Sequence, residues 1–73
     1  MEFEKISEII ADKQDIDTAD IKMESTLEEL KIDSLTMVEI VMDIEEAFDI
    51  TVELEDAKTV ADVVNYVAAK KNG

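Results

Sequence analysis

The sequence contains no cysteine, no histidine, no proline and a single glycine. Without cysteine or histidine, the chain forms no disulfides, no thiolate or imidazole metal sites, and no catalytic pairs of serine or cysteine with histidine. One glycine and no proline leave little with which to build a glycine-rich phosphate loop or a series of tight hairpin turns. These missing residue types argue against an enzyme and favour a helical protein.

Charge of one sign dominates the chain. Twenty Asp and Glu residues stand against seven Lys and no Arg, giving a net charge of −13 in 73 residues. Nucleic acid and anionic membranes repel such a surface, so we expect partners that present basic patches. Apolar residues nevertheless make up 47% of the sequence and recur periodically. This pattern predicts one folded domain, residues 1–73, rather than a disordered acidic tail.

The apolar runs are too short to cross a membrane. The acidic first residues also lack the basic and apolar regions of a secretion signal. We therefore expect a soluble, cytoplasmic protein that does not insert into membranes and acts as a monomer.

The many carboxylates raise the question of a calcium site. Asp15 and Asp17 begin like an EF-hand loop, but Asp20 replaces the obligatory glycine and Thr26 stands at the closing glutamate position. We predict no defined metal site, only diffuse and weak binding of divalent cations.

Apolar residues at spacings of three and four predict three longer helices. The first covers about residues 3–14, the second about 34–49, and the last follows the cap Thr59. A long loop is expected at 15–33, and one short helical turn at 54–58. The prediction is an all-α fold, a small antiparallel, up-and-down bundle of three longer helices and one short helix. The buried stripe expected on the last helix consists of Val60, Val63, Val64 and Val67.

The helix predicted at 34–49 carries two apolar stripes on different sides. At about 100° per residue, the wider one fills an arc of roughly 120° and is expected to face the core. Acidic residues flank the narrower stripe, so burying it would be costly, and the pattern suits an exposed docking face with a charged rim. The alternatives are a central helix covered on both sides, or scattered exposed apolar residues that need no functional explanation. The core stripe is Met37, Ile40, Val41, Ile44, Ala47 and Phe48; the other is Leu35, Val38 and Met42, flanked by Glu39, Glu45, Glu46 and Asp49.

Ser34 occupies the first position of this helix, directly after the N-cap candidate Asp33. The unpaired N–H groups and the positive end of the helix dipole favour a phosphate there. No general base accompanies the serine, which suggests an attachment point rather than a catalytic nucleophile. A capping or solvated hydroxyl is the alternative interpretation, as it is for Ser7 and Ser25.

The segment Leu-Lys-Ile-Asp-Ser-Leu at 30–35, the helix pattern that follows it and the closing residues 59–64 resemble the acyl carrier proteins of dissociated bacterial fatty-acid synthesis. The resemblance covers nearly the whole chain. It implies that a phosphopantetheinyl transferase moves 4′-phosphopantetheine from coenzyme A onto Ser34, flanked by Asp33 and Leu35. The thiol of that arm then carries acyl groups as thioesters, and the growing chain can enter between the helices.

The same resemblance implies that partners recognise the helix that begins at the modified serine. The implied partners are the phosphopantetheinyl transferase and fatty-acid synthesis enzymes with basic docking patches. A dedicated carrier for a polyketide, peptide or D-alanine pathway is one alternative; an unmodified acidic interaction module, in which Ser34 is only a cap, is another. The implied partner contacts are Leu35, Val38, Glu39, Met42, Glu45 and Glu46.

Three features depart from the family pattern. Lys31 occupies the place of a usual glycine, and Thr36 replaces the acidic residue common after Asp-Ser-Leu. The connector from Val52 to Thr59 is shorter than usual and lacks its usual proline. These changes leave the attachment chemistry intact.

Overall fold

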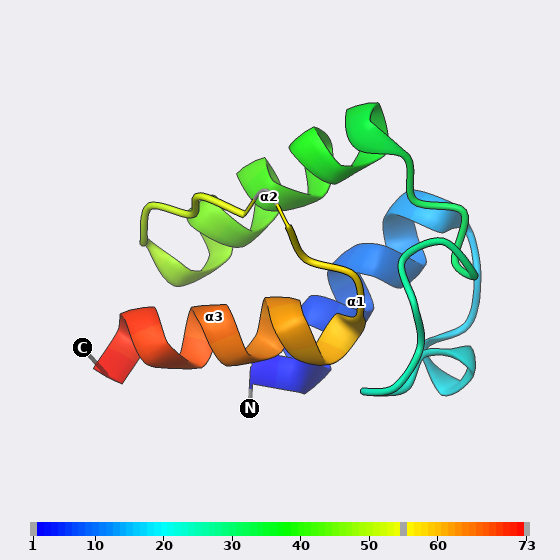
Figure 1. Ribbon diagram of the computed structural model, residues 1–73, viewed down its shortest axis with the longest axis horizontal. Helices are drawn as coiled ribbons and strands as arrows, with labels where there is room; N and C mark the ends of the chain where they lie inside the picture. The colour runs from blue at the N-terminus through cyan, green and yellow to red at the C-terminus, as the bar shows by residue number, and fades with distance from the viewer. Residues whose placement is uncertain (1, 55, 73) are drawn as a thin grey trace.

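The structure is a computed structural model that describes residues 2–54 and 56–72. Its regular elements are α1 (Glu2–Gln14), the 3-10 helix η1 (Thr18–Asp20), α2 (Ser34–Phe48) and α3 (Val60–Asn72) (Figure 1). The all-helical prediction is confirmed, and the starts and ends expected for the longer helices agree within one residue. No helix within the described ranges is both long enough and apolar enough to span a bilayer.

The short helix lies elsewhere than predicted. Of the expected turn at 54–58, Glu55 lies outside the described residues and the other positions are not helical. The N–H group of Lys58 donates to Asp62 of α3, and side chains of α2 and α3 accept from the N–H groups of Val52 and Glu53. These tertiary bonds take the place of the local ones that a helical turn would need. The short helix that does form is η1, in the loop after α1.

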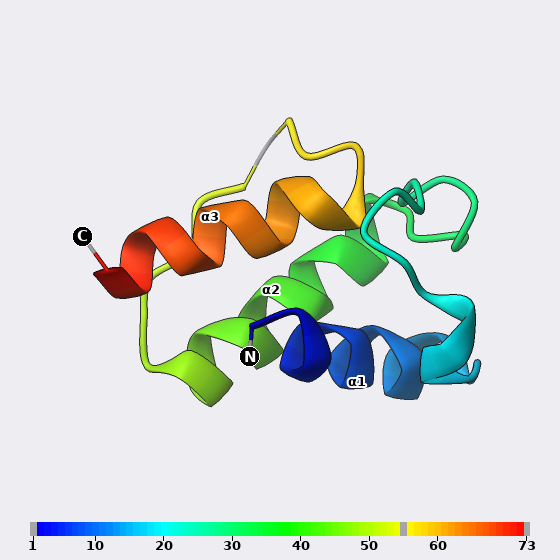
Figure 2. The same ribbon diagram turned by 90° about the horizontal axis from the view of Figure 1, so that it is seen from below.

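The helix directions also depart from an up-and-down bundle. α1 and α2 run antiparallel as predicted, but α2 and α3 run in the same general direction (Figures 1 and 2). The connector, residues 49–59, leads back from the end of α2 to the beginning of α3. Eleven extended residues reach about 36 Å, which exceeds the roughly 22 Å length of a 15-residue helix. The connector is therefore long enough to place α2 and α3 in the same direction.

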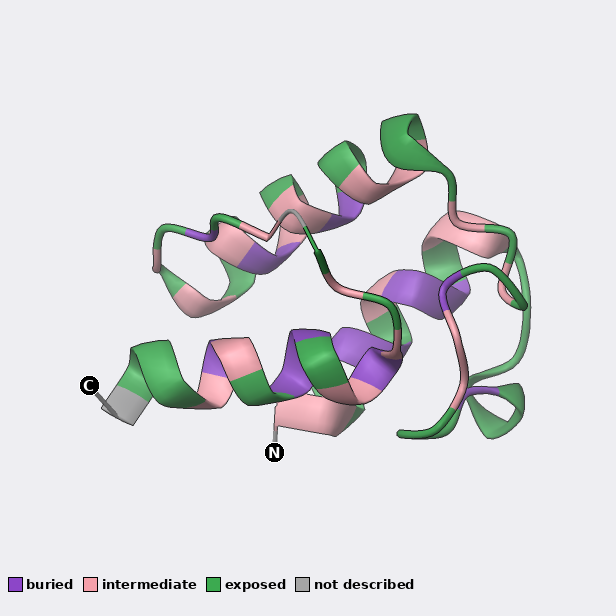
Figure 3. Cartoon of the chain, viewed as in Figure 1, coloured by how far each residue is buried: buried purple, intermediate pink, exposed green. Residues whose placement is uncertain are grey.

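The core lies between the three helices and is aliphatic (Figure 3). The predicted inward stripe of α3 is confirmed, because all four of its valines are buried. Ala47 is exposed although the sequence placed it on the core stripe of α2, because it lies at the edge of that arc. The largest fully buried side chains are Ile6, Ile10, Ile40, Ile44, Val60, Val63 and Val67.

The loop between α1 and α2 is held by single apolar side chains and by the beginning of α3. Ile21 and Leu27 are buried, whereas Ile16 and Met23 of the same loop are exposed. The N–H of Leu27 donates to the Lys58 carbonyl, and the N–H of Val60 donates to the Ser25 carbonyl, each at 2.9 Å. These bonds connect the loop that precedes Ser34 to the third helix.

Lys31 adopts a left-handed backbone conformation, with φ at 60°. A residue with a Cβ atom loses about 1 kcal/mol or more of stability in this region, whereas glycine does not. This difference explains why the proteins that the chain resembles usually have glycine at this position. We expect Lys31→Gly to raise the free energy of unfolding by up to about 1 kcal/mol, measured by urea denaturation.

Lys22→Gly is the matched control, because it removes the same charge from the same loop at a residue outside the left-handed region. It is expected to lower the free energy of unfolding, since glycine there only adds freedom to the unfolded chain. If both variants stabilised the fold equally, loss of a lysine charge rather than backbone strain would be the cause.

Candidate functional site

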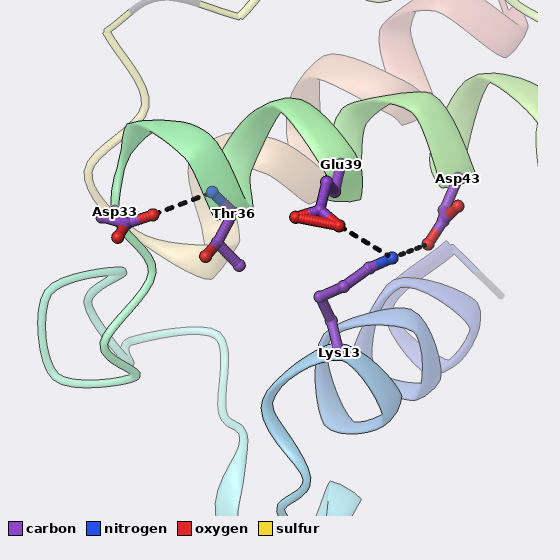
Figure 4. Close-up of polar contacts among 5 residues, drawn as sticks. All are labelled: Lys13, Asp33, Thr36, Glu39 and Asp43. Carbon is purple, nitrogen blue, oxygen red and sulfur yellow. Dashed lines mark hydrogen bonds and ion pairs between the residues drawn. The ribbon is translucent and has the colours of Figure 1, made fainter.

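Ser34 begins α2, and its side chain is exposed. The predicted cap is confirmed: Asp33 Oδ1 accepts a hydrogen bond from the Thr36 N–H at 2.8 Å (Figure 4). The Asp33 carbonyl accepts from the Met37 N–H, also at 2.8 Å. Asp33 therefore fixes the backbone that presents the Ser34 hydroxyl.

The cap also sets the electrostatics at this end of the helix. The hydrogen bond from the Thr36 N–H holds the pKa of Asp33 below its ordinary value. The cap is therefore ionised at neutral pH, and its contribution to stability is lost only as the pH falls through the lowered pKa. Asp33 already accepts the hydrogen bond of the Thr36 N–H, so that N–H would not bind a phosphate on Ser34. The positive end of the helix dipole would still stabilise the phosphate.

Gln14, at the end of α1, holds the segment just before Ser34. Its Nε2 donates to the carbonyls of Leu30 at 2.7 Å and Lys31 at 2.9 Å, and the Ile32 N–H donates to the Leu27 carbonyl at 2.9 Å. The sequence did not identify Gln14, because its partners are backbone groups that leave no residue pattern. The approach to the site is thus attached to the first helix.

The three serines differ in what their hydroxyl groups do. Ser7 is buried and donates to the Phe3 carbonyl at 2.6 Å, and Ser25 Oγ accepts from the Lys22 N–H at 3.0 Å. The Ser34 hydroxyl makes no hydrogen bond to any described residue. Of the three, Ser34 is both exposed and free to react.

A groove opens beside Ser34, bounded by α2, the connector and α3. Asp33 and Ser34 lie where α2 begins, and Met42 lies eight residues further along the same helix. At about 1.5 Å per residue, the groove follows α2 for at least about 12 Å from the serine. Its apolar lining consists of Leu27, Ile32, Met37, Val38, Val41, Met42, Val52, Leu54, Ala57 and Tyr66.

The narrower stripe of α2 lies outside the core. Leu35, Val38 and Met42 are 75%, 57% and 58% exposed. The alternative of a helix covered on both sides within this chain is therefore wrong. Glu46 is exposed on the same side, so the face has an apolar centre and an acidic edge.

Lys13 of α1 partly neutralises one edge of this face (Figure 4). Its Nζ lies 3.1 Å from an Asp43 carboxylate oxygen and 3.9 Å from one of Glu39. The hydrogen bond to Asp43, with the added charge of Glu39, raises the pKa of Lys13 above its ordinary value.

No group of three or more potential metal-ligating side chains is found among residues 2–54 and 56–72.

Glu45 lies on the opposite edge and faces the connector. Its Oε2 accepts a hydrogen bond from the Val52 N–H at 2.9 Å, and its side chain is half-buried. The structure thus separates Glu45 from the other five residues expected to contact partners. Those that it brings together on one exposed face are Leu35, Val38, Glu39, Met42 and Glu46.

Comparison with known proteins shows which family this chain is similar to. A family model described as "Phosphopantetheine attachment site" matches residues 4–67. The chain is 49% identical over 73 residues to an acyl carrier protein of Clostridium acetobutylicum, covering 94% of this chain and 95% of that protein. It is 46% identical over 66 residues to one of Streptococcus pneumoniae, covering 89% of each. It is 44% identical over 70 residues to one of Lactococcus lactis, covering 94% of this chain and 96% of the relative.

Proposed function

The chain belongs to the acyl carrier protein family. On that premise, we propose that 4′-phosphopantetheine is attached to Ser34 and that the protein serves dissociated fatty-acid synthesis. Members of this family are carriers rather than enzymes, and they bear a covalently attached 4′-phosphopantetheine. When bound, this arm supplies the thiol that the sequence lacks and on which acyl groups travel as thioesters. The observation that carries the assignment is the exposed, unengaged hydroxyl of Ser34 beside an apolar groove.

The residues around Ser34 fit an attachment role. The Ser34 Oγ bonds to the phosphorus that bears the pantetheine, the pyrophosphate P–O bond of coenzyme A breaks, and adenosine 3′,5′-bisphosphate leaves. The hydroxyl proton goes to a base of the transferase, because no described residue of this chain makes a hydrogen bond to that hydroxyl. Asp33 keeps the first turn of α2 in place while Ser34 stays exposed. The residues of this chain therefore orient the hydroxyl, and the partner enzyme performs the chemistry.

The groove is the proposed shelter for the acyl chain. Its floor along α2 includes Met37 and Val41, which are half-buried, and Leu54 lines it from the connector. Unbranched Met and aliphatic Val and Leu side chains accommodate a flexible hydrocarbon by small rotamer changes. Burying apolar carbon atoms there stabilises the carried chain by about 25 cal/mol per Å² removed from water.

The exposed face of α2 is the proposed docking surface. Leu35, Val38 and Met42 form its apolar centre, and Glu39 and Glu46 form its charged edge. Basic groups on the transferase and on synthesis enzymes would be attracted by the net charge of −13 and would then contact this face. Lys13 competes with such groups for Glu39, so Glu46 is the more available of the two carboxylates.

Incubation with coenzyme A and a promiscuous phosphopantetheinyl transferase tests the attachment, and intact mass should increase by one phosphopantetheine. A protein that stays unmodified would contradict the proposal. The pathway is tested next by offering the modified protein to loading enzymes for malonyl, aminoacyl and D-alanyl groups. Efficient loading by the malonyl transferase is expected; loading only by another enzyme would refute the fatty-acid pathway and leave the carrier role intact.

Reversing one edge charge should slow recognition without unfolding the domain. Glu46→Lys is expected to reduce the initial rate of modification several-fold at low salt, and the difference should shrink as salt screens it. Glu24→Lys makes the same charge change at an exposed loop residue outside α2 and is expected to keep a rate near that of the wild type. Equal slowing of both variants would mean that net charge, not the face of α2, guides the transferase.

A further inference from the structure

Two side chains from different helices hold one short stretch of the connector. The Val52 N–H donates to Glu45 Oε2 of α2 at 2.9 Å. The next N–H along the chain, that of Glu53, donates to the phenol oxygen of Tyr66 on α3, also at 2.9 Å. Val52, Glu53 and Tyr66 all line the groove beside Ser34. Two consecutive N–H groups of this groove wall are therefore hydrogen-bonded to side chains of α2 and α3, respectively.

Glu45 accepts the hydrogen bonds that end α2 and position the residues that follow it. Its backbone carbonyl accepts hydrogen bonds from the N–H of Asp49 and, at 3.2 Å, from that of Ile50. Its carboxylate accepts a hydrogen bond from the Val52 N–H, and the Val52 side chain is buried in the core. One residue therefore both ends the helix and determines where the next segment begins.

Beyond this point the connector is sparsely held. Among the described residues, the next backbone N–H anchored to α3 is that of Lys58, which donates to Asp62 Oδ2 at 2.9 Å. Between the two anchors, Leu54, Asp56 and Ala57 donate no backbone hydrogen bond to another described residue. Leu54 and Ala57 pack against the core, so displacing this wall of the groove requires separating these apolar contacts and breaking the hydrogen bonds at Val52 and Glu53.

We propose that Glu45 and Tyr66 are positioning residues that limit how far the groove opens and so select the length of acyl chain that the protein shelters. The inference rests on the proposed function, because it requires an acyl chain attached at Ser34. A chain longer than the resting groove fits only when the connector moves outward, and both hydrogen bonds oppose that movement. In this role Glu45 acts through an acceptor oxygen, not through a charge presented to partners.

Hydrogen exchange of the unmodified protein tests the two anchors directly. Glu45→Ala should accelerate exchange of the Val52 amide, and Tyr66→Phe, which removes only the hydroxyl, should accelerate that of Glu53. Glu45→Gln keeps an acceptor oxygen and removes the charge, so exchange at Val52 should stay near the wild-type rate. Unchanged exchange in both Glu45→Ala and Tyr66→Phe would overturn the assignment of these anchors.

Acyl-chain selection is tested on protein loaded with butanoyl, octanoyl, dodecanoyl or hexadecanoyl groups from the corresponding acyl-coenzyme A by the same transferase. The rate at which hydroxylamine cleaves the thioester reports how well each chain is sheltered. In Glu45→Ala and Tyr66→Phe, the chain that is cleaved most slowly should be longer than in the wild type, with a several-fold gain in protection at that length. Glu45→Gln should keep the wild-type profile.

The outcomes separate the two proposals. Wild-type protein that cannot be loaded contradicts the proposed function and not the role of the anchors. Loaded variants that share the wild-type length profile overturn the selection role, as does a Glu45→Gln profile that matches Glu45→Ala, because charge would then be the cause. Thermal melts confirm folding, and Tyr66→Phe keeps the test decisive if Glu45→Ala does not fold.

Discussion

Ser34→Ala is expected to fold normally and to gain no phosphopantetheine from coenzyme A, whereas the wild-type protein is converted completely. The side chain of Ser34 is exposed, and Asp33 rather than Ser34 caps α2, so alanine removes the nucleophilic oxygen without disturbing the helix. Alanine is also the best helix former. Intact mass after transferase treatment measures the loss, and circular dichroism of the same sample confirms the fold.

The other two serines provide the controls for that result. Ser25→Ala gives up only the acceptor of the Lys22 N–H, and it should be modified like the wild type. Ser7→Ala loses a buried hydroxyl bonded to the Phe3 carbonyl, so it should be less stable but still modified. If Ser34→Ala gained the group, or if Ser25→Ala lost it, the attachment site would have to be reassigned.

Ile44→Ala is expected to lower the free energy of unfolding by about 2–5 kcal/mol, because it leaves a cavity in the core. Ile44 is 0% exposed and lies on the inner face of α2. A domain of 73 residues has a stability of roughly 4–11 kcal/mol, so the loss is a large share of the total. Urea denaturation of the unmodified protein measures the change.

Met42→Ala is the paired variant on the same helix. Met42 is 58% exposed, so the truncation should cost less than about 1 kcal/mol while removing part of the proposed docking surface. Both side chains are large and apolar, so a difference in destabilisation between the two variants reports whether each side chain faces the core or the solvent. Comparable destabilisation by the two truncations would mean that the outer stripe contributes to the core, and the docking proposal would lose its physical basis.

The local elements of this protein could be predicted from the sequence because local interactions produce them. The spacing of Ile and Val residues specifies the buried faces of α1 and α3, and Asp33 begins α2 because its side chain accepts a nearby N–H group. The placement of Ser34 at that cap, and the two stripes of α2, follow from the same periodicity. All of these features depend on residues within about two turns of one another.

The remaining features join residues far apart in the chain, and no local period specifies them. Lys13 reaches across from α1 to Glu39 and Asp43, and Gln14 binds carbonyl groups 16 and 17 residues away. A helical projection places Glu45 at the edge of the proposed docking surface, yet its carboxylate accepts a hydrogen bond from the Val52 N–H. The direction of α3 and the location of the short helix likewise depend on how the connector is held. Such pairings are selected by packing and by the need to satisfy backbone N–H groups once the helices have come together.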